Sequence, residues 1–154
     1  QLGPEPLEED FSAAEFRIAL KRSAQAVKVK LLDQALVAGV GNIYASEALF
    51  RAGISPRKAA RRLTARETGR LHGTIRDVLA DAIACGSTIP LDFAGTGKRD
   101  GLFYYGRPSG AADYYEERLQ VYDREGEACV QCAGPIRRIV QAARSTYFCP
   151  QCQR

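Results

Sequence analysis

Methionine and long apolar runs are both missing from the sequence. The chain begins at Gln1 and holds no Met at all. Because a cytosolic translation product normally begins with Met, we expect the chain to be a fragment or a processed piece. No apolar stretch approaches the ~18 residues that a membrane-spanning helix needs, and we find no secretory leader. A membrane protein is therefore excluded, and we expect a cytoplasmic location.

What is present is the composition of an ordinary folded protein. The 154 residues, with a mass of 16.8 kDa, suit one domain or two small domains that share a core. A content of 45% hydrophobic and 26% charged residues is typical of neither a disordered nor a fibrous chain. The net charge of +4 is a mild excess that says little by itself.

The position of the charges is more informative than their sum. Residues 129–154 hold four arginines and no acid, whereas residues 1–15 hold five acids and no base. Residues 51–76 hold eight bases against the single acid Glu67. Two basic blocks in a chain that is otherwise near neutral indicate binding to a polyanion. Solvated faces of ordinary helices are an equally good interpretation of the same blocks.

Hydrophobic periodicity and capping signals predict a mostly α-helical chain with a small β zinc finger. Two capping boxes, Ser12 with Glu15 and Thr64 with Glu67, mark two helix starts. The expected helices cover residues 13–23, 28–37, 43–52 and 65–85, followed by a long loop at 87–115 and β-hairpins in 119–154. The expected divisions are an extended linker at 1–11, a helical domain at 12–118 and a zinc-finger domain at 119–154.

Four of the five cysteines have the spacing of a zinc site. Two C-x-x-C pairs, separated by sixteen residues, consist of Cys129, Cys132, Cys149 and Cys152. Each pair places two thiolates on one tight turn, and two turns make a closed tetrahedral shell for one structural Zn²⁺. Two disulfides are the alternative, which the absence of any sign of secretion disfavours. We expect Cys85 to be a buried core thiol, and the single His72 is not needed by this site.

The segment between the cysteine pairs predicts a β-hairpin with a basic tip. Residues 136–140 and 145–149 can pair as strands around a turn at 141–144. Such a small finger cannot bury a core of its own, so the metal supplies its folding energy. Arg144 at the tip has a guanidinium that suits bidentate contact with phosphate.

A glycine turn between two expected helices offers a second phosphate site. Gly39 and Gly41 could suggest a dinucleotide-binding loop, but no strand precedes them and Tyr44 stands where the next glycine is required. The free N–H groups of Gly41 and Asn42 would open a helix, and such an N-terminus attracts phosphate. A plain helical hairpin explains the same pattern.

Three stretches of the sequence resemble the formamidopyrimidine-DNA glycosylase (Fpg/Nei) family. Residues 36–47 read LVAGVGNIYASE, which is similar to the helix–two-turn–helix signature of that family. Residues 144–153 read RSTYFCPQCQ, which resembles its terminal zinc finger, and residues 2–7 resemble its interdomain linker. The residues Ile-Tyr-Ala-Ser-Glu at positions 43–47 favour the formamidopyrimidine branch over the endonuclease VIII branch.

The resemblance implies a function in base-excision repair. The family removes oxidised purines from double-stranded DNA and then nicks the abasic strand, so the implied partner is duplex DNA with a damaged base or an abasic site. Asn42 would match the turn asparagine that grips backbone phosphate, Lys28 a lysine on the DNA-facing side, and Arg144 the finger arginine that clasps phosphates. The family further implies a monomer that is associated with the nucleoid in a bacterium.

The departures from the family concern catalysis. The family's nucleophile is an N-terminal proline amine followed by a glutamate, both in a preceding β-rich domain that this chain lacks. Pro4 and Glu5 are no substitute, because the nitrogen of an internal proline is an amide. We therefore assign no catalytic residue and expect the chain to be inactive without its missing domain. The damaged-base loop around residues 88–103 also departs, with extra sequence at 106–115.

A function from another class stays open at this stage. The chain could be a stand-alone zinc-ribbon module for RNA or protein that merely shares helix–turn–helix elements. Such a module would show no preference for abasic or damaged duplex DNA.

Overall fold

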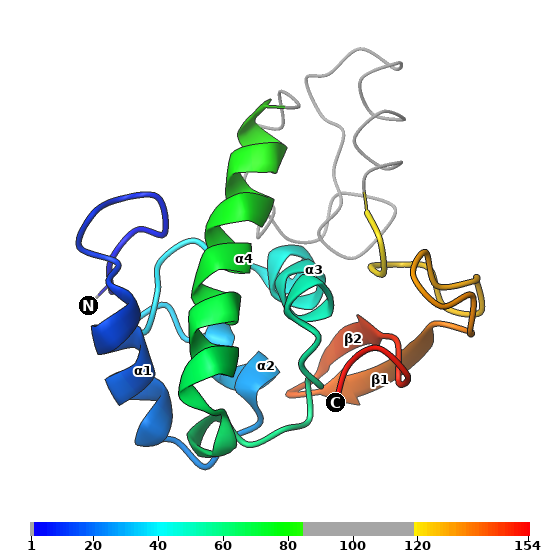
Figure 1. Cartoon of the computed structure of the whole chain (residues 1–154), viewed down its shortest axis with the longest axis horizontal. Helices are drawn as coiled ribbons and strands as arrows, with labels where there is room; N and C mark the ends of the chain where they lie inside the picture. The colour runs from blue at the N-terminus through cyan, green and yellow to red at the C-terminus, as the bar shows by residue number, and fades with distance from the viewer. Residues whose placement is uncertain (1, 85–118) are drawn as a thin grey trace.

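The computed structural model describes residues 2–84 and 119–154, and it confirms a helical core with a small two-stranded finger. The long loop expected at 87–115 and Cys85 lie outside the described residues. In chain order the elements are α1 (Ala13–Lys21), α2 (Val27–Leu31), α3 (Asn42–Ala52), η1 (Ala60–Arg62), α4 (Ala65–Ala84), β1 (Arg137–Gln141) and β2 (Arg144–Phe148). Figure 1 shows α4 between α1 and α3, with the hairpin on the far side of α3 from α1.

Local capping explains where α1 and α4 begin. Ser12 Oγ accepts a hydrogen bond from the N–H of Glu15 at 3.1 Å. At the start of α4, the N–H of Glu67 donates to Thr64 Oγ1 at 3.1 Å, and the N–H of Thr64 donates to Glu67 Oε1 at 2.9 Å. These two bonds make a complete capping box. The buried face of α4 carries apolar residues at helical spacing, namely Leu71, Ile75, Val78 and Ala82. Both predicted starts are confirmed.

The predicted helix over residues 28–37 is wrong in extent, because α2 ends at Leu31. Asp33 explains the early end. Its Oδ1 accepts from the N–H of Ala35 at 2.9 Å, and its carbonyl oxygen accepts from the N–H of Leu36 at 2.9 Å. A short acidic side chain that bonds the backbone in this way replaces a helical turn with a tight one. The chain then passes Gly39, whose φ of +86° suits glycine.

Helix α3 is the centre of the packing. Ten of its eleven residues are buried, so the helix has neighbours on almost every side. It packs against α4 on one side and against the hairpin on the other (Figure 1). Gly53, at a φ of +73°, closes its C-terminal end in the left-handed conformation that glycine adopts readily.

The hairpin has a tighter tip than the sequence predicts. Strands β1 and β2 are antiparallel, and Gln141 pairs with Arg144 across a turn of two residues, Ala142 and Ala143. Both alanines have positive φ, 51° and 65°, which is the conformation of a type I′ turn. Each predicted strand is therefore displaced by one residue toward the tip.

The extended segment at the start of the chain packs on the helical core. The N–H of Gly3 donates to Gln34 O at 2.8 Å, and the N–H of Ala38 donates to Pro4 O at 2.9 Å. A Cβ on Gly3 would lie 2.4 Å from Ala35 O, so only glycine fits this approach. Among the described residues, no helix has the length and hydropathy to cross a membrane.

A buried glutamate joins α3 to the segment that leads into the finger. The carboxylate of Glu47, 2% exposed, accepts from the N–H groups of Gln120, Val121 and Tyr122 at 2.8, 2.9 and 2.8 Å. Burial raises the pKa of Glu47 above its ordinary value, and the three N–H donors act in the opposite direction. Glu47 therefore fixes residues 120–122 against α3.

Replacing Glu47 should destabilise the protein strongly. Glu47→Ala should lower the free energy of unfolding by about 3 kcal/mol or more, because each buried N–H left without an acceptor costs about 1–3 kcal/mol. Glu47→Gln keeps one oxygen and should lose less. Urea unfolding of the metal-loaded chain measures both, with the exposed Glu125→Ala as a control that should change little.

The pH dependence tests the direction of the Glu47 pKa. A raised pKa in the folded chain means that wild type loses stability as pH rises past the ordinary glutamate range. The difference in stability between wild type and Glu47→Gln should therefore shrink with increasing pH. A difference that grows would show that the N–H donors outweigh burial.

Candidate metal centre and nucleic-acid interface

The four predicted cysteines come together at the base of the hairpin. Cys129 and Cys132 precede β1, Cys149 and Cys152 follow β2, and their four Sγ atoms all lie within 4.8 Å of one another. The Sγ atoms of Cys129 and Cys152 are 3.8 Å apart, and those of Cys132 and Cys149 are 3.5 Å apart. Zn–S bonds of about 2.3 Å in a tetrahedron place the sulfurs about 3.8 Å apart. The cluster therefore has the dimensions of a four-thiolate zinc site, and all four thiols are free of disulfides.

Backbone N–H groups support the sulfurs from outside the cluster. The N–H of Gln131 donates to Cys129 Sγ at 3.3 Å, and the N–H of Gly134 donates to Cys132 Sγ at 3.4 Å. Such bonds orient thiolate ligands and spread their charge. A side chain at residue 134 would crowd this knuckle, because a Cβ there would lie 3.1 Å from Gln151 Oε1.

The thiols of the cluster differ in acidity. Burial acts to raise the pKa of Cys129, but hydrogen bonds from backbone N–H groups and neighbouring thiols lower it to about 7. Burial raises the pKa of the Cys152 thiol to about 12. A divalent cation favours the thiolate of every ligand, so metal binding would release the remaining protons. These donors fit one structural Zn²⁺ and leave no ligand position open for chemistry.

The predicted phosphate-binding residues occupy one region that spans the helical core and the finger. Lys28 Nζ donates to Asn42 Oδ1, and Asn42 Nδ2 donates to Ser145 O at 2.9 Å. Lys28 is 0% and Asn42 2% exposed, so both side chains are inside the protein. These contacts link α2, the start of α3 and the start of β2, although Asn42 and Ser145 are 103 residues apart in sequence.

The other two predicted residues flank this buried link. Gly41 is the N-cap of α3 and is half-buried, whereas the residues of the first turn that follows it are buried. Arg144 is exposed where β2 begins, next to Ser145. The structure therefore brings all four predicted residues together, two inside and two at the surface.

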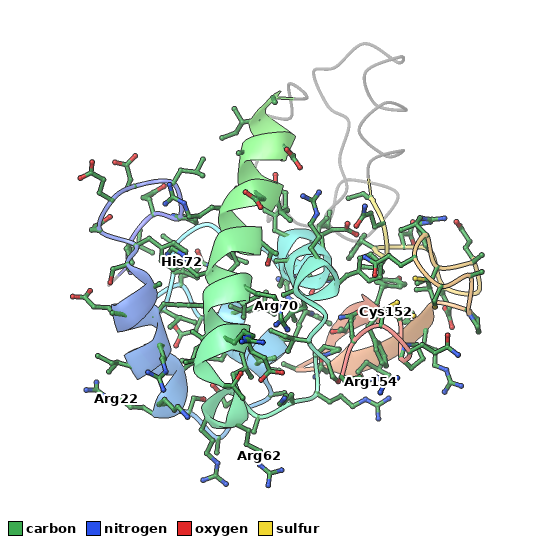
Figure 2. The ribbon with its side chains drawn as sticks, viewed as in Figure 1. Arg22, Arg62, Arg70, His72, Cys152 and Arg154 are labelled. Atoms are coloured by element: carbon green, nitrogen blue, oxygen red, sulfur yellow. The ribbon has the colours of Figure 1, made fainter. Side chains whose placement is uncertain are left out.

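The finger is attached to the core at its other end as well. Gln153 Nε2 donates to Ile54 O at 2.9 Å, while its Oε1 accepts from the N–H of Cys149 at 2.8 Å. The backbone of Arg154 pairs with Gly53 and Ser55 at 3.1 and 3.2 Å. Figure 2 labels Cys152 and Arg154 in this C-terminal segment of the finger. The metal centre is thus anchored to the C-terminal end of α3.

Much of the basic block at 51–76 has structural partners. Lys58 pairs with Glu67 at 2.8 Å, and Arg51 pairs with Asp81 at 2.9 Å. Arg70 Nε donates to Ala52 O at 3.0 Å. Arg76 Nη1 donates to Pro6 O at 2.7 Å. The charge of this block therefore indicates polyanion binding less strongly than its sequence suggests.

His72 lies in the packing between α4 and the first residues of the chain. Its Nε2 is 2.6 Å from Phe11 O, and its ring stacks on the Phe11 ring with centroids 4.4 Å apart. Figure 2 shows His72 on the side of α4 that faces the N-terminal segment, away from Cys152.

Sequence reasoning assigned no role to Glu47 or to the two glutamines that tie the finger to the core. Glu47 carried a signal, since it is the one acid inside the largely apolar run of residues 43–52, whose other charge is Arg51 near the end. Gln141 and Gln153 carried none, because a polar residue in a small finger is ordinarily solvated. Their partners, the carbonyl oxygens of Pro56 and Ile54, are known only from the fold.

Removing the metal should unfold the finger and spare the helical core. The chain should bind one Zn²⁺, and Cys149→Ser should lower zinc affinity by orders of magnitude because three thiolates no longer close the shell. Zinc content by atomic emission, together with amide exchange of residues 137–148, measures both effects. Cys85→Ser is the matched control and should keep one zinc per chain. A hairpin that stays protected after complete metal removal would contradict this dependence.

Comparison with known proteins finds matches for both the helical part and the zinc finger. Residues 2–92 match the formamidopyrimidine-DNA glycosylase H2TH domain, and residues 126–154 match the zinc finger found in FPG and IleRS. The chain is 47% identical over 154 residues to formamidopyrimidine-DNA glycosylase from Thioalkalivibrio sulfidiphilus, covering 100% of this chain and 52% of the relative. It is 46% identical over 153 residues to that of Thermus thermophilus, covering 99% and 54%.

Solved structures show the same likeness. The crystal structure of MutM (Fpg) from Thermus thermophilus matches with a TM-score of 0.83 at 47% identity, over 99% of this chain and 53% of the other. Lactococcus lactis Fpg, non-covalently bound to DNA with an AP site, matches with a TM-score of 0.81 at 36% identity, over 99% and 50%. The chain spans about half the length of these relatives. It belongs to the formamidopyrimidine-DNA glycosylase family, of which it carries the H2TH domain and the zinc finger.

Proposed function

We propose that this chain is the damaged-DNA-binding part of a base-excision-repair glycosylase with AP lyase activity that acts on oxidised purines. The observation that carries the proposal is the junction of the H2TH turn with the zinc-finger hairpin through the Asn42–Ser145 hydrogen bond. Relatives of the same architecture, such as Lactococcus lactis Fpg, have been solved with DNA that contains an abasic site. The proposed ligand is therefore duplex DNA with a damaged base or an abasic site.

The geometry supports a clamp on the phosphate backbone. Helix α3 begins at the half-buried Gly41 without a side-chain cap, and N–H groups at a helix start carry a partial positive charge that attracts phosphate. Arg144 adds a permanent charge with fixed fork geometry on the adjacent tip of the hairpin. Contacts of this kind hold a distorted strand when a nucleotide is flipped, which costs a few kcal/mol. In this proposal the zinc ion acts by shaping the finger.

We also propose that the reaction itself uses residues of the part of the relatives that this chain does not cover. Schiff-base chemistry needs a free amine. Three of the four described lysines have side-chain partners: Lys28 with Asn42, Lys30 with Asp33, and Lys58 with Glu67. The fourth, Lys21, is exposed at the end of α1, which lies across α4 from the hairpin (Figure 1). The proline and glutamate that the family resemblance implies would come from a partner domain of the same protein. The assembled protein would act as a monomer on nucleoid DNA. Within this chain, the linker would end at residue 11 and the helical domain at residue 118, where the zinc-finger domain begins.

Binding should depend steeply on salt and on Arg144. Each phosphate neutralised by a cation contributes about 0.9 to the slope of log K against log salt for duplex DNA. Arg144→Ala should weaken binding by similar factors on all sequences, as measured by fluorescence anisotropy with an abasic-site duplex. Arg17→Ala is the matched control, because Arg17 is exposed on α1, on the other side of α4 from the hairpin (Figure 1). Unchanged affinity of Arg144→Ala would contradict the clamp.

The chain alone should bind damaged DNA without reacting with it. Borohydride reduction of a mixture with abasic-site DNA should trap no covalent adduct, since the proposed nucleophile is absent. Adding the proline-bearing domain of a relative should restore trapping, which gel electrophoresis detects as a shifted band. An adduct formed by this chain alone would contradict the proposed division of labour.

A further inference from the structure

Helix α1 carries apolar residues on its outward face as well as on its buried one. Phe16 and Leu20 are buried and belong to the core. Ala14 and Ile18 lie on the exposed side, where Ile18 is 52% exposed. An open hollow of about 400 Å³ lies over these two residues. A surface helix ordinarily turns polar residues outward, so packing within the described part of the chain does not explain this second apolar face.

Three cations surround this depression, which we call the α1 hollow. Arg17, Lys21 and Arg22 line it together with Ala14 and Ile18, and all three are exposed. The spacing of three and four residues along the helix places these side chains on one face. None of the three cations forms an ion pair with a described residue. The α1 hollow therefore has an apolar floor and a positively charged rim.

Two more arginines extend the positive charge beyond the end of α1. The N–H of Arg61 donates to Ser23 O at 2.9 Å, so η1 lies beside the residue that follows Arg22. Arg61 and Arg62 are both exposed. Figure 2 shows Arg22 and Arg62 along the same edge of the molecule, away from Cys152. The rim of the α1 hollow thus continues into a basic edge formed by η1.

The electrostatics of an isolated helix explain only part of this arrangement. A cation in the last turn, such as Lys21, offsets the partial negative charge at the C-terminal end of a helix. That effect does not extend to Arg17 in the middle of α1, and it gives no reason for an exposed Ile18. An apolar centre with a charged rim is instead the anatomy of a protein–protein interface.

The shape and position of the α1 hollow favour a protein segment over DNA as its occupant. A phosphate backbone would match the cations, but it has no apolar side chain to cover Ile18. Helix α1 also lies across α4 from the hairpin, so the hollow is not part of the proposed phosphate clamp (Figure 1). An acidic peptide that carries an apolar side chain matches both the charge and the floor of the hollow.

We propose that the α1 hollow binds an acidic segment of another protein. One large apolar side chain of that segment covers Ile18, and its carboxylates pair with Arg17, Lys21 and Arg22. The arginines of η1 attract further carboxylates of the segment, and a guanidinium can hold a carboxylate in bidentate fashion. This site is separate from the DNA-binding surface, and the inference does not rest on the proposed function.

A model acidic peptide tests this site on the zinc-loaded chain. The probe is a fluorescein-labelled peptide of sequence EDDLDDE, and fluorescence anisotropy measures its affinity. Ile18→Ser should weaken binding about tenfold, because the apolar contact with the leucine is lost. Arg17→Ala and Lys21→Ala should each weaken binding about two- to fivefold, since ion pairs at a rim stay partly solvated.

A double-mutant cycle identifies the apolar contact. Replacing the leucine of the peptide by serine should weaken binding to the wild-type chain as much as Ile18→Ser does. The same replacement should have almost no further effect on the Ile18→Ser variant, because the two side chains contact each other. Substitutions at these exposed positions should leave the fold intact.

Matched controls come from the hairpin. Val140 is 63% exposed and Arg137 is exposed, so both resemble the tested residues in chemistry and accessibility. Val140→Ser and Arg137→Ala should bind the peptide as the wild-type chain does. An excess of abasic-site duplex should not displace the peptide, and the α1 variants should keep the wild-type salt slope of DNA binding.

The contrary results are equally specific. No peptide binding, binding that does not depend on the leucine, or equal losses for Ile18→Ser and Val140→Ser would overturn the proposed site. Displacement by duplex DNA, or a reduced salt slope in Arg17→Ala, would show a nucleic-acid surface instead. Displacement by the proline-bearing domain of a relative would show an interdomain surface and would overturn it as well. Loss of the phosphate clamp appears only in the Arg144→Ala measurement, so the two proposals fail separately.

Discussion

The burial of α3 on nearly all sides is the constraint on which the rest of the structure depends. A helix that contacts α4 on one side and the hairpin on the other has little access to water for its polar groups. An unpaired buried polar group is costly, so pairing within the protein is strongly favoured. Asn42 and Glu47 find theirs in segments more than seventy residues away. The polar residues of α3 therefore determine how the chain folds back on itself.

This constraint also explains why the proposed binding residues and the structural residues are so closely mixed. The same helix begins at the half-buried Gly41 beside the finger and uses its second turn to hold residues 120–122. The finger gains a firm platform although its own core is too small to fold alone. Metal, helix and hairpin thus form one unit, with contacts at both ends of α3.

Short-range chemistry made much of this fold predictable from the sequence. The capping boxes at Ser12 and Thr64, the cysteine spacing and the hairpin all follow from local patterns, and all are confirmed. The length of α2 was not predictable from periodicity, because Asp33 ends the helix through bonds to its own neighbouring backbone. The roles of Glu47, Gln141 and Gln153 depend on partners distant in sequence, and one sequence does not reveal such pairs. The family resemblance predicted phosphate-binding residues but gave no sign that Asn42 is buried.

The attachment of residues 153 and 154 to the exit of α3 bears on how the protein folds. Gly53, Ile54 and Ser55 obtain these partners only after about a hundred further residues have been synthesised. Contacts of such large sequence separation carry a high loop-closure entropy and form late. A nascent chain therefore holds a helical core whose central helix is still uncovered on one side. Closure by the finger would then come late in folding and would depend on zinc, because the metal supplies the folding energy of the finger.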